Sequence, residues 1–176
     1  MKKLSPILFK FIVTYFIFIN SAYTDTRFVS YPLNSIIVVD GDTIKTFSDV
    51  KIRLEGIDAP EMKQICENKF KSPYACGEVA KSKLESVLDK DSNPPGKRIY
   101  CYYSEVDRYK RLIAECFLGK DSSFNINKYM VRYGLAVAYL KYSKKYLNTQ
   151  ELAKKEKYGL WQGTFIMPEE WRRKNK

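Results

Sequence analysis

Apolar and polar residues alternate along several short stretches of the chain. Ser35 to Thr46 is rich in isoleucine and valine and fits one strand, or a hairpin that turns near Asp40-Gly41. Val50 to Leu54 alternates and fits the next strand of the same sheet. Arg98 to Tyr103 and Leu112 to Phe117 have the same character. The pattern therefore predicts a sheet of short strands.

A helical period replaces the alternation between these two groups of strands. Cys76 to Leu88 places Val79, Leu84 and Val87-Leu88 on one face, which predicts an amphipathic helix. The segment that follows, Asp91 to Gly96, contains two prolines and a glycine. These residues interrupt regular structure, so we expect the helix to end before them.

Two further helices are expected in the last third of the chain. Asn125 to Tyr133 reads as a short helix closed by Gly134. Asn148 to Tyr158 reads as a second helix, with Asn148 or Thr149 as its N-cap. Because strands come first and helices mostly later, the order predicts an α+β domain built around a small barrel.

The remaining segments have no clear period. We expect a polar, poorly defined lead-in at 23–34, a loop at 61–74, an apolar extended segment at 135–142 and a frayed polar end at 172–176. The predicted organisation is therefore a leader at 1–22, the lead-in, a domain at 35–165 and a basic tail at 166–176.

The N-terminus resembles an export signal. Lys2 and Lys3 precede an apolar stretch from Ile7 to Ile19, and Ser21 and Ala22 offer small residues for cleavage. The stretch is short for a membrane span of about 20 residues, although an uncleaved anchor is the alternative. We therefore expect a secreted or periplasmic protein, with membrane contact only if the leader is kept.

The charge balance points to a polyanionic partner. The formal net charge is +11, and loss of residues 1–22 would leave +8. A small basic domain suits nucleic acid or an anionic membrane, although the charge could also serve solubility alone. The 14 tyrosines favour nucleic acid slightly, because aromatic rings can stack on unpaired bases.

Four cysteines gain meaning in an exported chain, because disulfides form outside the cytosol. Cys101 and Cys116 lie in two predicted strands around a common turn, so a simple hairpin places them opposite each other. Cys66 and Cys76 flank a polar segment and could tie its ends. We favour these two disulfides. Four reduced thiols are the alternative, and zinc is disfavoured because the C-x-x-C spacing is missing.

The chain has no histidine, and this limits the available chemistry. Without histidine there is no Ser-His or Cys-His nucleophile pair and no histidine base, which favours a carboxylate as any general base. Acids occur near the strand ends at Asp40, Asp42, Asp58 and Glu61, with Arg53 between them. If the strands that carry Asp42 and Asp58 are neighbours, their carboxylates converge and need a cation or an arginine between them. Ca²⁺ with oxygen ligands is a natural occupant.

Five separated motifs occur in an order that resembles the staphylococcal nuclease (thermonuclease) family. They are VDGDTI at 39–44, IRLEGIDAPE at 52–61, DRYKR at 107–111, VRYGLA at 131–136 and AKKEKYGLW at 153–161. The resemblance implies a five-stranded OB-fold β-barrel with about three α-helices. It also implies a monomeric, Ca²⁺-dependent nuclease that acts on DNA and RNA.

The resemblance also implies roles for individual residues. Metal ligands fall on Asp42, Asp58 and the backbone carbonyl of Ala59. Glu61 falls on the residue that activates the attacking water. Arg53 and Arg111 fall on the two arginines that bind the phosphate and stabilise the transition state.

Other positions match residues around the bound nucleotide. Tyr109 and Tyr139 match tyrosines near the nucleotide, and Asp40 matches an acidic residue with a more structural role. Lys110 stands where the family has glycine. If that position requires a positive φ, lysine strains the turn by about 1 kcal/mol or more. Lys110 could instead add a phosphate contact, and both readings stay open here.

Two other functions compete with the nuclease. A non-catalytic OB module binds nucleic acid through basic and aromatic surfaces, but such a module does not need the full set of carboxylates and arginines. A membrane-tethered protein would use its positive charge on lipid, and nothing in the carboxylate–arginine set calls for lipid.

Overall fold

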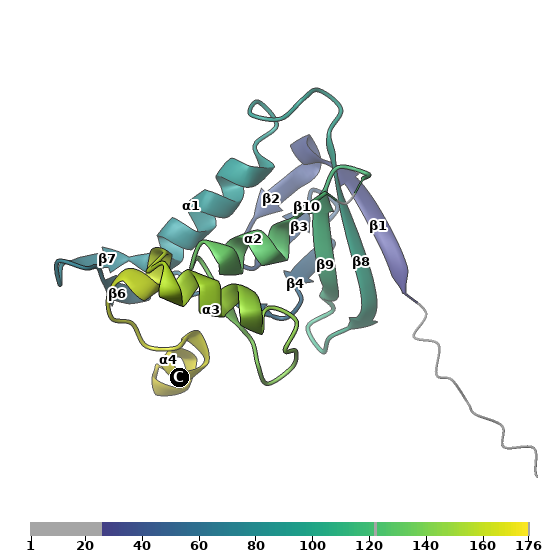
Figure 1. Ribbon diagram of the computed structural model, residues 1–176. Helices are drawn as coiled ribbons and strands as arrows, with labels where there is room; N and C mark the ends of the chain where they lie inside the picture. Colours follow the sequence, from purple (N-terminus) through teal and green to yellow (C-terminus); the bar gives the residue numbers. More distant parts are fainter. Residues whose placement is uncertain (1–25, 122, 176) are drawn as a thin grey trace, which may run out of the picture.

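The computed structural model of the protein describes residues 26–121 and 123–175 (Figure 1). The predicted leader at 1–22 lies outside these residues. The elements in chain order are β1 (Arg27–Pro32), η1 (Leu33–Ser35), β2 (Ile36–Val38), β3 (Thr43–Thr46), β4 (Lys51–Leu54), β5 (Ile57–Asp58), β6 (Ile65–Glu67), β7 (Pro73–Ala75), α1 (Cys76–Leu88), β8 (Arg98–Val106), β9 (Leu112–Leu118), β10 (Phe124–Asn125), α2 (Ile126–Arg132), β11 (Val137–Ala138), α3 (Leu147–Lys155), η2 (Gly159–Gln162) and α4 (Pro168–Lys174).

The main sheet has the strand order β1-β8-β9-β4-β3-β2, with β10 paired to β9. It curls into a half-barrel, and α1 and α2 lie in its hollow (Figure 1). The pairing of β4 with β9 is parallel and that of β8 with β9 is antiparallel. Two small sheets, β5–β11 and β6–β7, lie beside the main one. This is the predicted α+β architecture, consistent with the OB fold.

The core fills the space between the curled sheet and the helices. Alternate residues of the strands point inward, and Ile44, Ile52 and Leu54 are essentially inaccessible to solvent. Leu84 of α1 and Met130 of α2 pack against them. Burying such a side chain contributes roughly 1.5–3 kcal/mol, so this cluster fixes the strands that end at the acidic residues.

Most of the predicted elements are confirmed. The chain turns between β2 and β3 near Asp40, and α1 has the predicted bounds. The prediction for the buried face of α1 is partly wrong, because Val79 is 41% exposed and Ala80 is buried in its place. In α3 neither Asn148 nor Thr149 is the N-cap; the N-cap is Tyr146 and the helix begins at Leu147.

Both disulfides have the predicted pairing, and the described cysteines are all paired. Cys101 lies directly opposite Cys116 in the β8–β9 ladder, with a Cα–Cα distance of 4.1 Å. Cys66 and Cys76 close the β6–β7 hairpin onto the start of α1. That hairpin corrects the expected loop at 61–74: β6 and β7 pair from Ile65↔Ala75 to Glu67↔Pro73.

Two segments outside the predicted domain are also folded. The expected lead-in contains β1, which pairs along its whole length with β8, and Arg98 donates a hydrogen bond to the carbonyl of Ser30 at 2.8 Å. The expected basic tail at 166–176 contains α4, a fourth helix among the described residues, and this helix takes in residues 172–174 of the expected frayed end. Pro168 in its first turn, acids at Glu169 and Glu170 and the basic residues that follow suit a helix and its dipole.

The apolar segment at 135–142 is extended only in part. β11 covers Val137–Ala138 and pairs with β5. The chain then turns, with the amide of Tyr142 donating to the carbonyl of Tyr139. Within the described residues, no helix has the length and apolar character needed to cross a membrane.

Candidate functional site

The turn between β2 and β3 presents Asp42 toward the end of β5. Asp40 accepts a hydrogen bond from the amide of Asp42 at 3.0 Å, which closes the turn. Asp42 is buried, and its carboxylate accepts from the amide of Ala59 at 2.7 Å and from the hydroxyl of Thr43 at 3.1 Å. A Cβ on Gly41 would lie 2.7 Å from that of Ala59, so this close approach requires glycine.

Arg53 on β4 lies between two buried carboxylates. Its register opposite Thr43 brings it beside Asp42, with which its guanidinium forms an ion pair. The same guanidinium donates to Asp58 at 3.0 Å and to the carbonyl of Ile57 at 3.3 Å. The expected convergence of Asp42 and Asp58 is therefore present, and an arginine separates their charges.

Burial shapes the electrostatics of this cluster. Burial lowers the pKa of the Arg53 guanidinium, and the carboxylates of Asp58 and Asp40 oppose this shift. Burial likewise raises the pKa of Asp40, against the opposing charge of Arg53. The opposite charges of the cluster thus oppose the effect that burial has on each of these groups.

Glu61 follows the cluster and is held through its backbone. Its amide donates to Oε1 of Gln64 at 3.2 Å, and its carbonyl accepts from the amide of Gln64 at 2.8 Å. A Cβ on Gly77, at the start of α1, would lie 2.0 Å from that carbonyl oxygen, so only glycine allows α1 to approach this closely. The Glu61 carboxylate itself remains 37% exposed, which suits a group that must reach water.

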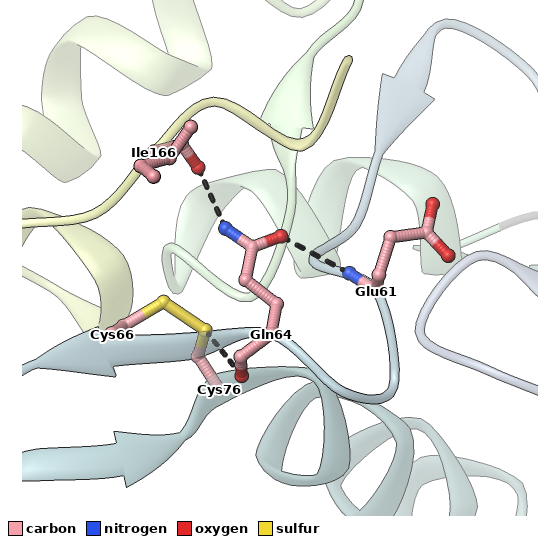
Figure 2. The surroundings of a disulfide bond; sticks show 5 residues. All are labelled: Glu61, Gln64, Cys66, Cys76 and Ile166. Carbon is pink, nitrogen blue, oxygen red and sulfur yellow. Dashed lines mark hydrogen bonds between the residues drawn. A yellow bond between two sulfur atoms is a disulfide. The ribbon is translucent and has the colours of Figure 1, made fainter. Parts of the chain in front are cut away.

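Gln64 links Glu61 to the C-terminal segment, as Figure 2 shows. Its side chain is inaccessible to solvent, and Nε2 donates to the carbonyl of Ile166 at 2.6 Å. The disulfide between Cys66 and Cys76 lies beside it, with Sγ of Cys76 3.4 Å from the carbonyl oxygen of Gln64. The disulfide thus packs against the loop that carries Glu61 and Gln64.

A third arginine, which the sequence prediction missed, joins the cluster from α4. Arg172 donates to both oxygens of Asp58 at 2.9 Å each, and to Oε1 of Glu61 at 2.9 Å. Burial lowers the pKa of Arg172, but its hydrogen bonds to Asp58 and Glu61 outweigh burial and raise that pKa above its ordinary value. The sequence pattern of α4 is typical of a helix. No local pattern, however, predicts the contact of Arg172 with Asp58 and Glu61, or the contact of Gln64 with Ile166.

Arg111 lies at the edge of the cluster and pairs with a different acid. Its guanidinium contacts Asp107 at 2.8 Å, and Asp107 also accepts from the amides of Tyr109 and Arg111. Its charge nevertheless lowers the pKa of both Asp40 and Arg53. Arg111 therefore shares the electrostatic field of the site without contacting its carboxylates.

The turn before Arg111 has the backbone that the glycine pattern indicates. Lys110 adopts a φ of +62°. This left-handed conformation costs a lysine about 1–2 kcal/mol relative to glycine, and the bonds to Asp107 hold the turn against it. The side chain of Lys110 is exposed, so it is accessible to a ligand as well.

The two tyrosines of the predicted site have different surroundings. Tyr109 is 60% exposed, and the guanidinium groups of Arg108 and Arg111 lie 4.9 and 5.4 Å from its ring centre. Tyr139 follows β11 and donates its amide to the carbonyl of Gly56. Burial raises the pKa of Tyr139, and the charge of Asp58 raises it further.

The donor set of the predicted cation site suits a hard cation. Asp42 and Asp58 offer carboxylate oxygens that are buried and already neutralised by guanidinium groups, so the site is built for positive charge. Among the described residues no three acidic or cysteine side chains gather as a metal-binding group. Two carboxylates and a backbone carbonyl at Ala59 would have to be completed by water.

Comparison with known proteins supports the resemblance. The family model described as "Staphylococcal nuclease homologue" matches residues 51–163. An "Uncharacterized endonuclease" of Haemophilus influenzae is 34% identical over 146 residues, which cover 79% of this chain and 71% of that protein. The "Micrococcal nuclease" of Shigella flexneri is 29% identical over 153 residues, which cover 79% of each chain.

A third relative shows that the family carries more than one name. The "Succinoglycan biosynthesis protein ExoI" of Rhizobium meliloti is 32% identical over 127 residues. The match covers 70% of this chain but 61% of that protein, so the chain spans less than two thirds of its length. With the family model matching more than half of the sequence, and the motifs and fold in agreement, the chain belongs to the staphylococcal nuclease family.

Proposed function

We propose that the protein is a Ca²⁺-dependent nuclease that hydrolyses phosphodiester bonds of DNA and RNA. The observation that carries this proposal is the convergence of Asp42, Asp58 and Arg53, with Glu61 at the open side. A module that only binds nucleic acid would have no use for buried carboxylates, because they repel phosphate. The printed names of two relatives, an endonuclease and a micrococcal nuclease, agree with a hydrolytic role.

Glu61 is the proposed general base. A carboxylate is a weak base at neutral pH, so it has to act by its position on a water molecule. Its backbone is fixed on both sides by Gln64 and by α1, whereas its side chain reaches solvent. This combination of a fixed backbone and an accessible carboxylate suits proton abstraction from water.

Positive groups around Glu61 are proposed to stabilise the charge that grows on the phosphate. Arg53 and Arg111 would donate to the phosphate oxygens, since a planar guanidinium can bind two of them. When bound, Ca²⁺ at Asp42, Asp58 and the carbonyl of Ala59 supplies further positive charge. Removing one such donor typically costs about 3–4 kcal/mol of transition-state stabilisation.

The rest of the substrate would lie along the exposed basic and aromatic residues. Tyr109 and Tyr139 would offer rings for stacking, and Lys110 would add a positive charge beside Arg111. The formal charge of +11 would draw nucleic acid to this face and make binding depend on salt. We propose that the protein acts as a monomer.

The proposed setting is outside the cytosol, in the periplasm or the medium. Two disulfides support an oxidising compartment, and the leader predicted from the sequence is an export signal or an anchor. Calcium is plentiful in such a compartment.

The experiment is digestion of single-stranded DNA and of RNA by the oxidised protein, with Ca²⁺ and with a chelator. We expect cleavage that requires Ca²⁺. Binding of the nucleic acid without cleavage under both conditions would contradict the proposal and would support the non-catalytic module.

A further inference from the structure

Arg172 places a positive charge where the proposed cation would bind. Its two terminal nitrogens donate to the two oxygens of Asp58, and Arg53 donates to one of the same oxygens. Asp58 is 1% exposed, so these donors surround a carboxylate that water hardly reaches. A divalent cation on Asp58 would have to share its oxygens with a guanidinium at contact distance, and the like charges would repel.

The same side chain also binds the proposed base. Arg172 donates to Oε1 of Glu61 at 2.9 Å. A carboxylate oxygen that accepts a charge-assisted hydrogen bond is less able to take a proton from water. The docked helix α4 therefore engages both a cation ligand and the base through one residue.

The attachment of α4 has a firm part and a weak part. The segment before it is held by Gln64 on the carbonyl of Ile166, and by Glu67, which pairs with Thr164 through backbone hydrogen bonds of 2.9 and 3.2 Å. Within α4 itself the buried residue is Pro168. Trp171 is half-buried. The polar contacts that dock the helix are the ion pairs of Arg172 and that of Glu169 with the exposed Lys141.

We propose that α4 is an autoinhibitory arm whose Arg172 competes with a divalent cation for Asp58, so that cation binding and docking of α4 exclude each other. The inference rests on the proposed cation site at Asp42 and Asp58. In the docked state Arg172 stands in for the cation. In the undocked state Asp58 and Glu61 are released together, while Gln64 keeps the end of the arm at Ile166.

Competition predicts a change in cation affinity that does not depend on catalysis. The apparent affinity of a site is reduced by the fraction of molecules in which it is available. If α4 is docked in about nine molecules of ten, removing the Arg172 contact raises the affinity about tenfold. We would titrate CaCl₂ calorimetrically into the oxidised wild type, Arg172→Gln and Arg173→Gln. Arg173 is the matched control, because it is exposed on the same helix and loses the same charge.

Amide exchange of α4 gives a second readout. The amides of Trp171 and Asn175 donate to the carbonyls of Met167 and Trp171, and docking should slow their exchange. We expect Ca²⁺ to speed exchange at Trp171 and Asn175 in the wild type and in Arg173→Gln. In Arg172→Gln we expect fast exchange with or without Ca²⁺, and an affinity about tenfold higher.

The inference is overturned if Arg172→Gln binds Ca²⁺ no more tightly than the control, if Ca²⁺ leaves exchange in wild-type α4 unchanged, or if none of the proteins binds Ca²⁺. Failure of the proposed nuclease would look different, because it would appear as Ca²⁺ binding with release of α4 but no cleavage of nucleic acid.

Discussion

Gln64 fixes the backbone of Glu61 and connects it to the far end of the chain. One side-chain atom of Gln64 accepts from the amide of Glu61 at 3.2 Å, and another donates to the carbonyl of Ile166 at 2.6 Å. The glutamine is inaccessible to solvent, so neither partner can be replaced by water without opening the site.

Replacing Gln64 should affect both stability and activity. Gln64→Leu keeps much of the volume but leaves the partly buried amide of Glu61 and the carbonyl of Ile166 without their present partner. We expect the free energy of unfolding to fall by about 1–3 kcal/mol, because a polar group that loses its partner away from water costs about that much. Urea denaturation measures this loss. A variant as stable as the wild type would show that Gln64 does not hold the two segments together.

The left-handed turn at Lys110 offers a stabilising substitution. Lys110→Gly should raise the free energy of unfolding by about 1 kcal/mol, because glycine adopts a φ of +62° without strain. Lys110→Ala is the control: it removes the same charge but keeps Cβ, and we expect little gain. Thermal unfolding compares them. Equal stability of the two variants would mean that the turn is not strained.

The two disulfides should differ in what they support. Their loops close over 10 and 15 positions, so the loss of either by paired Cys→Ala substitution should cost about 3 kcal/mol. The loss of Cys66–Cys76 should also speed amide exchange at Glu67 and Thr164. These two residues hydrogen-bond to each other at the β6–β7 hairpin, which the disulfide no longer closes. The loss of Cys101–Cys116 is the control, and equal exchange in both variants would refute the link between the first disulfide and the C-terminal segment.

The Arg111 turn should respond to acid. Burial raises the pKa of Asp107, but hydrogen bonds from the backbone and side chain of Arg111 outweigh burial and lower that pKa below its ordinary value of 3.8. A carboxylate whose pKa is depressed in the folded state stabilises the fold above its unfolded pKa. This contribution is lost as pH falls through the folded pKa.

The comparison of Asp107→Asn with the wild type tests this dependence. The stability difference should be constant between about pH 5 and 7 and should shrink below the ordinary pKa of 3.8. Urea denaturation across this range measures it. A difference that stays constant down to the lowest pH would show that the pKa of Asp107 is not depressed in the fold.

Features set by local pattern could be predicted from the sequence. The β2–β3 turn, α1 and the Cys101–Cys116 pair each depend on residues close in the chain, and the structure has them. The approach of Asp42 to Asp58 was expected only if their strands were neighbours. β3 and β5 do not pair, and Arg53 on β4 contacts both carboxylates instead. The family resemblance suggested glycine, and with it a possible positive φ, at the position of Lys110, and the structure has that φ.

Features set by distant partners could not be predicted in this way. β1 is a strand because it pairs with the edge of β8, and the residues from Arg27 to Pro32 carry no local pattern that predicts this pairing. Gln64 meets a residue 102 positions away, and Arg172 meets Glu61 across 111 positions. Such contacts depend on how the elements pack, so the sequences around Gln64 and Arg172 do not predict them.

The most direct test of the account is the rate at which Glu61→Gln cleaves single-stranded DNA in saturating Ca²⁺. The amide cannot accept the proton of water, so we expect the rate to fall about 100-fold or more, with the fold and Ca²⁺ binding kept. Glu78→Gln is the control, since Glu78 is an exposed glutamate in the first turn of α1, and it should cleave at the wild-type rate. A Glu61→Gln protein that cleaves as fast as this control would contradict the account.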